Sequence, residues 1–133
     1  MKDPNNPCLF CNTTDKEYLF ENDLAFSTFD TYPVSKLHVL IIPKRHIKNY
    51  FELSNDEILA CNKIILLSKN KIEQMDKKIK GFNIGTNCGK VAGQSINHCH
   101  IHLIPRRLGD VESPQGGVRG VIPSKQHYVR KSK

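Results

Sequence analysis

The sequence contains no apolar run that approaches the roughly 20 residues of a membrane-spanning helix. Its first seven residues are polar and have no apolar core of the kind found in secretory signal peptides. The 133 residues also contain no internal repeat and no linker that would separate two domains. We therefore expect one domain with a core of its own, no membrane partner and a cytoplasmic location.

The sequence also lacks an even set of cysteines. Five cysteines weaken a disulfide framework, and they suit free thiols or metal ligation in a cytosolic chain better. Cys8 and Cys11 form a Cys-x-x-Cys pair, which alone is ambiguous between a redox pair and one half of a zinc site. A redox pair normally opens a helix after a strand, whereas this pair lies in a segment rich in proline and asparagine. A structural zinc site would need two more ligands from elsewhere.

Acidic residues are scarce relative to basic ones, since 13 Asp and Glu stand against 20 Lys and Arg. Much of the resulting net charge of +7 lies in residues 106–133, where seven basic residues accompany two acidic ones. This bias favours anionic partners, including phosphates and nucleic acid. A solvated basic tail explains the same charges equally well.

The order of the expected elements is strands, one long helix and strands again, which predicts an α+β fold with an antiparallel sheet. Residues 18–20 and 24–29 are β-prone runs around a polar turn and predict a hairpin. Residues 38–42 predict a buried strand that Pro43 ends. Residues 82–87 predict a further strand.

The clearest helix is predicted to begin at Ser54. Ser54 and Glu57 have the spacing of a capping box, in which each side chain bonds a backbone N–H group of the other residue. Apolar residues then keep a helical spacing as far as Ile79, and Gly81 is the expected stop. The sequence thus predicts one long scaffold helix.

Three of the six histidines alternate in the segment 97–105, whose other residues are mostly apolar. A strand would place His98, His100 and His102 on one face, with the intervening side chains in the core on the other. Each imidazole carries two nitrogens that need partners, so three in a row are rarely explained by packing. The segment is therefore the first candidate for a functional site.

Two kinds of chemistry fit three such histidines. Binding of one metal ion by all three is disfavoured, because His98 and His102 would lie about 13 Å apart along a strand, at about 3.3 Å per residue. A neighbouring pair of rings can share a metal. The alternative is nucleophilic catalysis, in which the central His100 attacks phosphorus and forms a phosphoramidate that water cleaves. Its other nitrogen must then be held by an acceptor.

Together with Gln94, this segment resembles the signature of the histidine triad (HIT) family, His-x-His-x-His followed by apolar residues. The resemblance covers most of residues 8–107 and includes the following segments: Cys8 to Cys11, Leu24 to Phe26, His38 to His46 and Gly93 to Ser95. It implies an α+β HIT-like fold with about five antiparallel strands, one long and one short helix, and a sheet that continues across a homodimer. It also implies a HIT domain at residues 1–107 with an N-terminal zinc loop, and a basic tail at residues 108–133 that packs on or near the active site.

The resemblance further implies roles for single residues. His100 matches the nucleophile that becomes transiently nucleotidylated, and His102 and Gln94 match the other catalytic residues. The substrate-binding positions match Asp30, His38, Asn87 and Ser95. Asp30 would accept hydrogen bonds from ribose hydroxyls, although an aspartate that caps a turn explains this residue equally well.

Zinc-bearing members of the family supply a ligand set that maps onto Cys8, Cys11, His46 and His98. The resemblance thus implies a structural zinc ion that fixes His98, so that this ring cannot also shuttle protons. The three histidines would then serve two sites.

By the same resemblance, the expected function is hydrolysis at the α-phosphate of a dinucleoside polyphosphate such as diadenosine tetraphosphate. Residues 106–107 and 116–123 resemble C-terminal segments of HIT proteins with that activity. Two other enzymes remain open: a nucleoside phosphoramidase, and a phosphorylase or nucleotidyltransferase that uses phosphate in place of water. A low-turnover zinc protein that binds nucleotides or nucleic acid is an alternative of another class. The expected partners are a small nucleotide and a second copy of the chain, and the basic tail leaves nucleic acid open.

Overall fold

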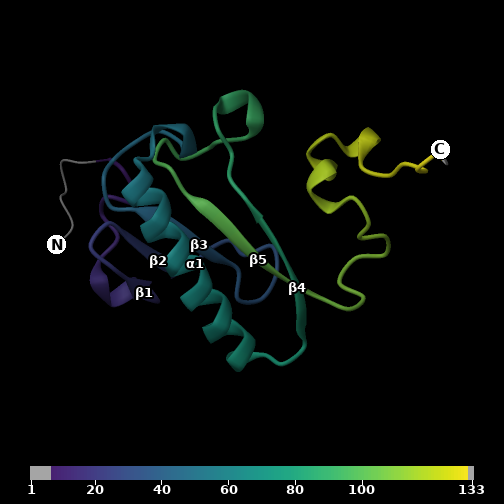
Figure 1. The fold of residues 1–133 in the computed structure, drawn as a ribbon, viewed down its shortest axis with the longest axis horizontal. Helices are drawn as coiled ribbons and strands as arrows, with labels where there is room; N and C mark the ends of the chain where they lie inside the picture. Colours follow the sequence, from purple (N-terminus) through teal and green to yellow (C-terminus); the bar gives the residue numbers. More distant parts are fainter. Residues whose placement is uncertain (1–6, 132–133) are drawn as a thin grey trace.

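A computed structural model describes residues 7–131 and shows a five-stranded antiparallel sheet with one long helix on one face (Figure 1). The elements are β1 (Phe20–Glu21), β2 (Ala25–Phe29), β3 (Val39–Pro43), α1 (Asn55–Met75), β4 (Ile79–Gly85) and β5 (Ile101–Arg107). The spatial order is β1-β2-β3-β5-β4, so the last strand inserts between β3 and β4. The predicted α+β class and antiparallel sheet are confirmed. None of the helices within residues 7–131 is long and apolar enough to cross a membrane.

The core lies between the sheet and α1. Ile41 of β3 and Leu103 of β5 stand at its centre, and Ile64 and Ile72 of α1 pack on them; all four side chains have 0% exposure. Burial of such a side chain contributes about 1.5–3 kcal/mol. The sheet is therefore a rigid support for the loops at its ends.

Helix α1 begins as predicted but ends earlier. The capping box is present, since Ser54 Oγ accepts from the Glu57 N–H group and Glu57 Oε1 accepts from the Ser54 N–H group. The helix stops at Met75, so the predicted stop at Gly81 is wrong. Asp76 Oδ1 accepts from the Lys78 N–H group in a tight turn, and Ile79 is already the first residue of β4. Ile79 fits the apolar spacing of the helix because it is also buried in the core, but it reaches the core from strand β4.

The prediction of one strand that holds all three histidines is also wrong. Strand β5 begins at Ile101, so only His102 belongs to it, and His98 and His100 lie in the irregular segment before it, which bends at residues 96–98. The Cys99 N–H group donates to the carbonyl of Ile47 over 2.8 Å, so this segment is bonded to the loop after β3. The predicted core side of the segment is confirmed, since Cys99, Ile101 and Leu103 are buried.

Short 3₁₀ helices complete the structure: η1 (Asp15–Glu17), η2 (Tyr50–Glu52), η3 (Lys90–Ala92), η4 (Gly117–Val121) and η5 (Pro123–Lys125). The last two belong to the C-terminal tail, which lies beyond β4 in Figure 1 and approaches it where Gly117 faces Asn83. The predicted domain limits at residues 1 and 133 lie outside the described residues. Packing of the tail on the active site stays a prediction.

Candidate active site and metal cluster

The three triad histidines meet two different sets of neighbours. His98 joins Cys8, Cys11 and His46, whose ligand atoms all lie within 4.8 Å of one another. His102 joins Asp30 and His38 in a second group of the same kind. His100 stands between the two groups, with its ring centroid 5.3 Å from that of His102. The segment therefore divides its imidazoles between two sites.

The Cys8, Cys11, His46 and His98 cluster has the composition and the spacing of a tetrahedral metal site. Sγ of Cys8 lies 3.4 Å from Nδ1 of His98, Sγ of Cys11 lies 3.2 Å from Nδ1 of His46, and the two Nδ1 atoms are 3.1 Å apart. With bonds of about 2.1 Å to nitrogen and about 2.3 Å to sulfur, neighbouring ligands of a tetrahedral zinc ion lie about 3.3–3.8 Å apart. The four residues fit such an ion and could hold it.

Backbone groups prepare this cluster for a cation. The Nε2–H group of His98 donates to the carbonyl of Pro43 over 2.8 Å, so the lone pair of that ring lies on Nδ1, toward the two thiols. The Cys11 N–H group donates to Sγ of Cys8 over 3.3 Å, which holds the two cysteines of the pair together. Burial lowers the pKa of His98, which keeps the ring neutral. A neutral ring with a free lone pair is the state that binds a metal.

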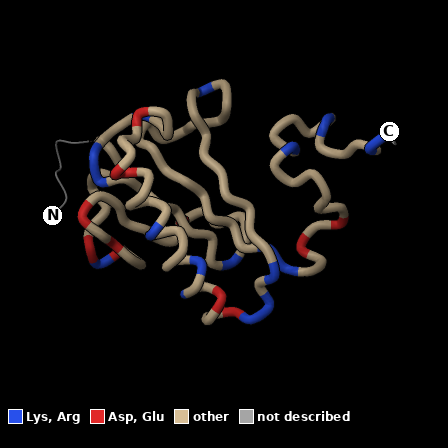
Figure 2. The backbone as a smooth tube through the Cα atoms, viewed as in Figure 1, with Lys and Arg blue, Asp and Glu red and all other residues tan. Residues whose placement is uncertain are grey.

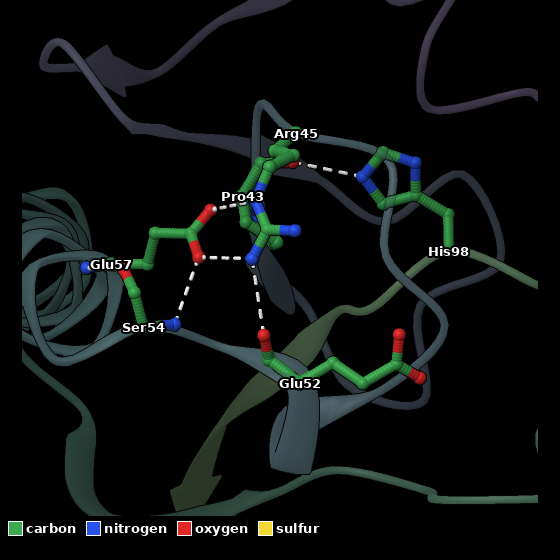
Figure 3. A network of polar contacts seen from close by, with 6 residues as sticks. All are labelled: Pro43, Arg45, Glu52, Ser54, Glu57 and His98. Atoms are coloured by element: carbon green, nitrogen blue, oxygen red, sulfur yellow. Dashed lines mark hydrogen bonds and ion pairs between the residues drawn. The ribbon is translucent and has the colours of Figure 1, made fainter.

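A salt bridge that the sequence did not predict supports the loop after β3, which carries Arg45 and His46 (Figure 3). Nη2 of Arg45 donates to Oε1 of Glu57 over 2.7 Å, Nε donates to Oε2 over 3.1 Å, and Nη2 also reaches the carbonyl of Glu52. The hydrogen bond from Arg45 lowers the pKa of Glu57 to about 2. Because Glu57 also caps α1, the start of the helix is tied to the chain between Pro43 and His46. The sequence offers one signal for this salt bridge: Arg45 stands beside the candidate ligand His46, and the capping Glu57 follows 12 residues later.

His100 has the opposite arrangement of proton and lone pair. Its Nδ1–H group donates to the carbonyl of His98 over 2.8 Å, which leaves a lone pair on Nε2. The edge of Phe10 packs on the ring at a centroid distance of 5.0 Å and helps to fix it. Only 7% of His100 is exposed, yet the residue lines a pocket of about 250 Å³. A held imidazole with a free lone pair at a pocket can act as a nucleophile.

The pocket is lined by both apolar and polar side chains. The apolar residues are Leu9, Phe10, Tyr32, Leu40 and Ile96, and the polar side chains are those of Asp30, Thr31, Asn87, Ser95, His100 and His102. Such a mixture is typical of sites for small ligands with an aromatic part and a polar part. The structure thus brings together five of the predicted catalytic and substrate-binding residues: Asp30, Asn87, Ser95, His100 and His102.

Gln94, which was predicted to be catalytic, is placed differently. Its Oε1 accepts from the Gly89 N–H group over 2.9 Å, and its Nε2 donates to the carbonyls of Lys48 and Ile96 over 2.6 and 3.0 Å. The side chain does not line the pocket of His100. In this structure Gln94 closes the loop between β4 and the histidine segment, and its catalytic role stays a prediction.

Asp30 serves the turn and also faces the pocket. Its Oδ1 accepts from the Tyr32 N–H group over 2.8 Å, as expected of an aspartate that caps a turn. Its Oδ2 lies 3.5 Å from Nε2 of His38. The position of Asp30 is therefore compatible both with capping the turn and with binding a substrate, because Asp30 also lines the pocket.

His38 does not line the pocket, although it was predicted to bind substrate. It is buried just before β3 at 2% exposure, and its Nε2 lies 2.9 Å from Nδ1 of His102. Burial lowers the pKa of His38, and burial with the neighbouring His100 and His38 lowers that of His102 to about 4. Both rings are neutral at neutral pH.

Two arginines at the start of the basic segment are already neutralised. Arg106 forms a two-pronged bridge to Asp110 and also bonds Oδ1 of Asn83, and Arg107 bonds Oδ2 of Asp76 over 3.0 Å. In Figure 2 the basic positions at the end of β5 accordingly lie beside acidic ones. These two residues therefore contribute little free positive charge.

Residues 12–109 match the HIT domain family. The chain belongs to the HIT family. Among its relatives, the adenylylsulfatase HINT3 of Arabidopsis thaliana is 37% identical over 110 residues, which are 79% of this chain and 55% of that protein. The adenosine 5'-monophosphoramidase HNT1 of Candida albicans is 32% identical over 111 residues, or 75% of this chain and 70% of that protein.

Solved structures of HIT proteins share the fold. A hypothetical histidine triad nucleotide-binding protein from Sulfolobus tokodaii is 34% identical, with a TM-score of 0.71 over 80% of this chain and 76% of that one. A zinc-bound histidine triad protein from Mycobacterium smegmatis is 26% identical, with a TM-score of 0.70 over 80% of each chain. At least one solved structure of the family thus contains zinc, and in this chain the Cys8, Cys11, His46 and His98 cluster could bind a metal.

Proposed function

We propose that this HIT protein is a nucleotide hydrolase in which His100 attacks the α-phosphate of its substrate. The observation that carries the proposal is the hydrogen bond from Nδ1 of His100 to the carbonyl of His98, because it leaves the Nε2 lone pair at the pocket. The names of two relatives, an adenylylsulfatase and a phosphoramidase, support cleavage of a nucleotide.

The reaction has two steps. In the first, a bond forms between Nε2 of His100 and phosphorus while the bond from phosphorus to the leaving group breaks, and the leaving group departs with the electron pair. The nucleotidylated ring is a cation, which the carbonyl of His98 stabilises at Nδ1. In the second step, water attacks phosphorus, the nitrogen–phosphorus bond breaks, and the nucleoside monophosphate leaves as water gives up a proton to solvent.

The first substrate class that we propose is a dinucleoside polyphosphate. The pocket of about 250 Å³ is small, so it suits one nucleotide, whose ribose hydroxyls would meet Asp30. A second hollow of about 560 Å³ adjoins it and shares Leu9, Ser95 and Ile96 with it. A substrate with a second nucleotide beyond the scissile bond could extend into that hollow.

A nucleoside phosphoramidate is the second candidate substrate, which the activity named for the Candida albicans relative favours. Adenylyl sulfate is a third, from the name of the Arabidopsis thaliana relative. All three classes share the nucleophile and differ in the group that leaves. The relative rates on the three are therefore what separates them.

We also propose that Cys8, Cys11, His46 and His98 hold a structural zinc ion. When bound, the ion would cross-link the N-terminal loop to the histidine segment. His98 would then orient His100 through its own carbonyl and would take no part in proton transfer.

Homodimer formation and a cytoplasmic location complete the proposal. β4 is an edge strand of the sheet within the described part of the chain, so a second copy could pair with it. Sedimentation of the purified protein would measure its oligomeric state directly.

The test of the proposed function is a substrate panel combined with trapping of the covalent intermediate. Diadenosine tetraphosphate, adenosine phosphoramidate and adenylyl sulfate are each mixed with the enzyme, quenched in alkali within milliseconds to seconds, and digested for mass spectrometry. We expect an adenylyl group on the peptide that contains His100, and none in His100→Ala. Turnover of no member of the panel, or turnover without any adduct on that peptide, would overturn the proposal.

A further inference from the structure

We propose that one end of the sheet binds the phosphate backbone of single-stranded nucleic acid through four lysines, Lys36, Lys77, Lys78 and Lys80. These four residues are named the lysine patch. They come from the loop before β3, the turn between α1 and β4, and the start of β4. None of the four lines the pocket of His100, so the proposal does not rest on the proposed function.

Arg107, at the end of β5, brings two of these segments together. Its Nη2 group donates to the carbonyl of Lys36 over 2.9 Å, and its Nε group donates to Oδ2 of Asp76 over 3.0 Å. The other carboxylate oxygen of Asp76 accepts from the Lys78 N–H group over 2.9 Å. That hydrogen bond, then Arg107 and the charge of Lys36, lower the pKa of Asp76, so Lys36 acts on the same carboxylate. Basic positions accordingly gather around the turn between α1 and β4 in Figure 2.

Lys80 joins the lysine patch through an irregularity in the sheet. Ile79 pairs with Arg107, and Gly81 pairs with the residue before it in β5. The register shifts between these two pairs, so Lys80 stands in a bulge without a partner residue in β5. A bulge re-aims a side chain out of the regular alternation of a strand. The exposed Lys80 therefore lies at the same end of the sheet as the other three lysines.

The carboxylates at this end are already neutralised, whereas the lysines are not. Three ion pairs engage the carboxylates: Asp76 with Arg107, Asp110 with Arg106, and Glu73 with Lys69. Among the ion pairs within residues 7–131, none involves a lysine of the patch. All four lysines are exposed. Their positive charges thus favour an anionic partner.

The type of cation indicates how such a partner is recognised. Both arginines at this end are engaged with carboxylates, so neither offers a free guanidinium fork to one phosphate or one base edge. Lysine ammonium groups act as point charges, which suit a repeating chain of phosphates bound without sequence preference. An anionic lipid surface fits less well. The fully exposed Leu108 near the patch is followed by the exposed Glu112, which such a surface would repel.

An exposed aromatic ring favours a single strand over a duplex. Tyr32 lies in the same loop as Lys36 and is 87% exposed. Its N–H group donates to Oδ1 of Asp30 over 2.8 Å, which holds the backbone of the ring in place. Bases of a single strand can stack on such a ring, whereas the bases of a duplex are already stacked on one another. Tyr32 thus adds a stacking position to the charges of the lysine patch.

Fluorescence anisotropy of the full-length protein tests the proposal. The probes are labelled single strands of RNA and DNA of mixed sequence and the corresponding DNA duplex, each titrated at about 50 to 200 mM salt. The patch variant combines Lys77→Glu with Lys78→Glu. The matched control combines Lys16→Glu with Lys63→Glu, which changes the net charge equally at exposed lysines of η1 and α1.

We expect the single strands to bind with a slope of log K against log salt of about −3, since each of four phosphate contacts contributes about −0.7. The patch variant should bind at least about 10-fold more weakly, with a slope of about −1.4, while the control stays within about 3-fold of the native protein. Tyr32→Ala should weaken binding of the single strands about 10-fold and leave the slope unchanged.

Three results would overturn the proposal: no binding at the lowest salt, an equal loss in the patch and control variants, or tighter binding of the duplex. Binding to vesicles of phosphatidylserine and phosphatidylcholine but to no nucleic acid would also overturn it and would assign the lysine patch to a membrane. Thermal unfolding checks that both variants fold. Nucleotide cleavage by the patch variant should equal that of the native protein, which keeps this test separate from that of the proposed function.

Discussion

His98 and His102 stand four residues apart and hold their protons on the same nitrogen, yet they serve different sites. Each is expected to hold its lone pair on Nδ1. Nε2 of His98 faces the carbonyl of Pro43, and Nδ1 of His102 faces Nε2 of His38, whose own Nδ1 accepts from the Val34 N–H group. The lone pair of His98 faces two thiols and a second imidazole, and that of His102 faces an N–H group. The difference lies in what surrounds each ring: His98 belongs to a cluster that could hold a metal ion, and His102 lines the pocket.

The largest effect should come from the ring that lies between them. We expect His100→Ala to lower kcat by at least about 10³-fold, because the nucleophile is removed. Nucleotide binding, zinc content and thermal stability should change little, since the metal cluster is untouched. Stopped-flow or discontinuous assays measure kcat, and metal analysis and thermal unfolding provide the controls. Turnover above a tenth of the native value would show that another group attacks phosphorus.

The next largest effect should follow from removing one thiol of the Cys8, Cys11, His46 and His98 cluster. We expect Cys11→Ser to lower bound zinc from about one equivalent to less than a tenth, and to lower the melting temperature, because a tightly bound ion stabilises the fold by about 4 kcal/mol at 1,000 times its Kd. Cys88→Ser is the matched control, since Cys88 is a free thiol outside the cluster. Equal metal content in the two variants would refute the assignment of the ligands.

Glu57 allows a test of the support behind the metal cluster. We expect Glu57→Gln to cost about 1–2 kcal/mol at pH 7, since the charged hydrogen bonds to Arg45 are weakened. The pKa of Glu57 is lowered from 4.5 to about 2, so its contribution is complete above pH 4.5 and is lost as the pH falls toward 2. Urea unfolding across that range should therefore show the two proteins converging in acid. A constant difference at every pH would mean that Glu57 acts through packing alone.

The smallest effect should follow from the helix cap. We expect Ser54→Ala to cost about 1 kcal/mol of unfolding free energy, because the Glu57 N–H group loses its acceptor. Neither kcat nor zinc content should change. A change in either would show that the start of α1 controls the metal cluster or the pocket more directly than its contacts indicate.

The parts of the fold that sequence predicts are those with a local cause. The capping box at Ser54 and Glu57 marked the start of α1, and alternation of apolar residues marked the core side of the histidine segment. The end of α1 was missed, because the apolar spacing runs on through Ile79 even though that residue is buried from a strand. Periodicity alone does not distinguish these two ways to bury one side chain.

The composition of the metal cluster was predicted, whereas the hydrogen bonds that orient each ring were not. Val34, whose N–H group bonds His38, has an apolar side chain and carries no signal of this role. The pairing of Arg107 with Asp76 likewise joins segments that are distant in the chain, so the free basic charge of the tail was overestimated. Backbone donors and long-range ion pairs depend on the fold, and a motif does not record them.

The most direct test of the division of labour is one long-range ¹H–¹⁵N spectrum of the zinc-loaded native protein near neutral pH. The structure predicts that His98 and His102 carry their protons on Nε2 and that His100 carries its proton on Nδ1. The same spectrum should show the Nδ1 resonance of His98 shifted by the metal. A proton on Nε2 of His100, or one tautomer shared by all three rings, would contradict the account.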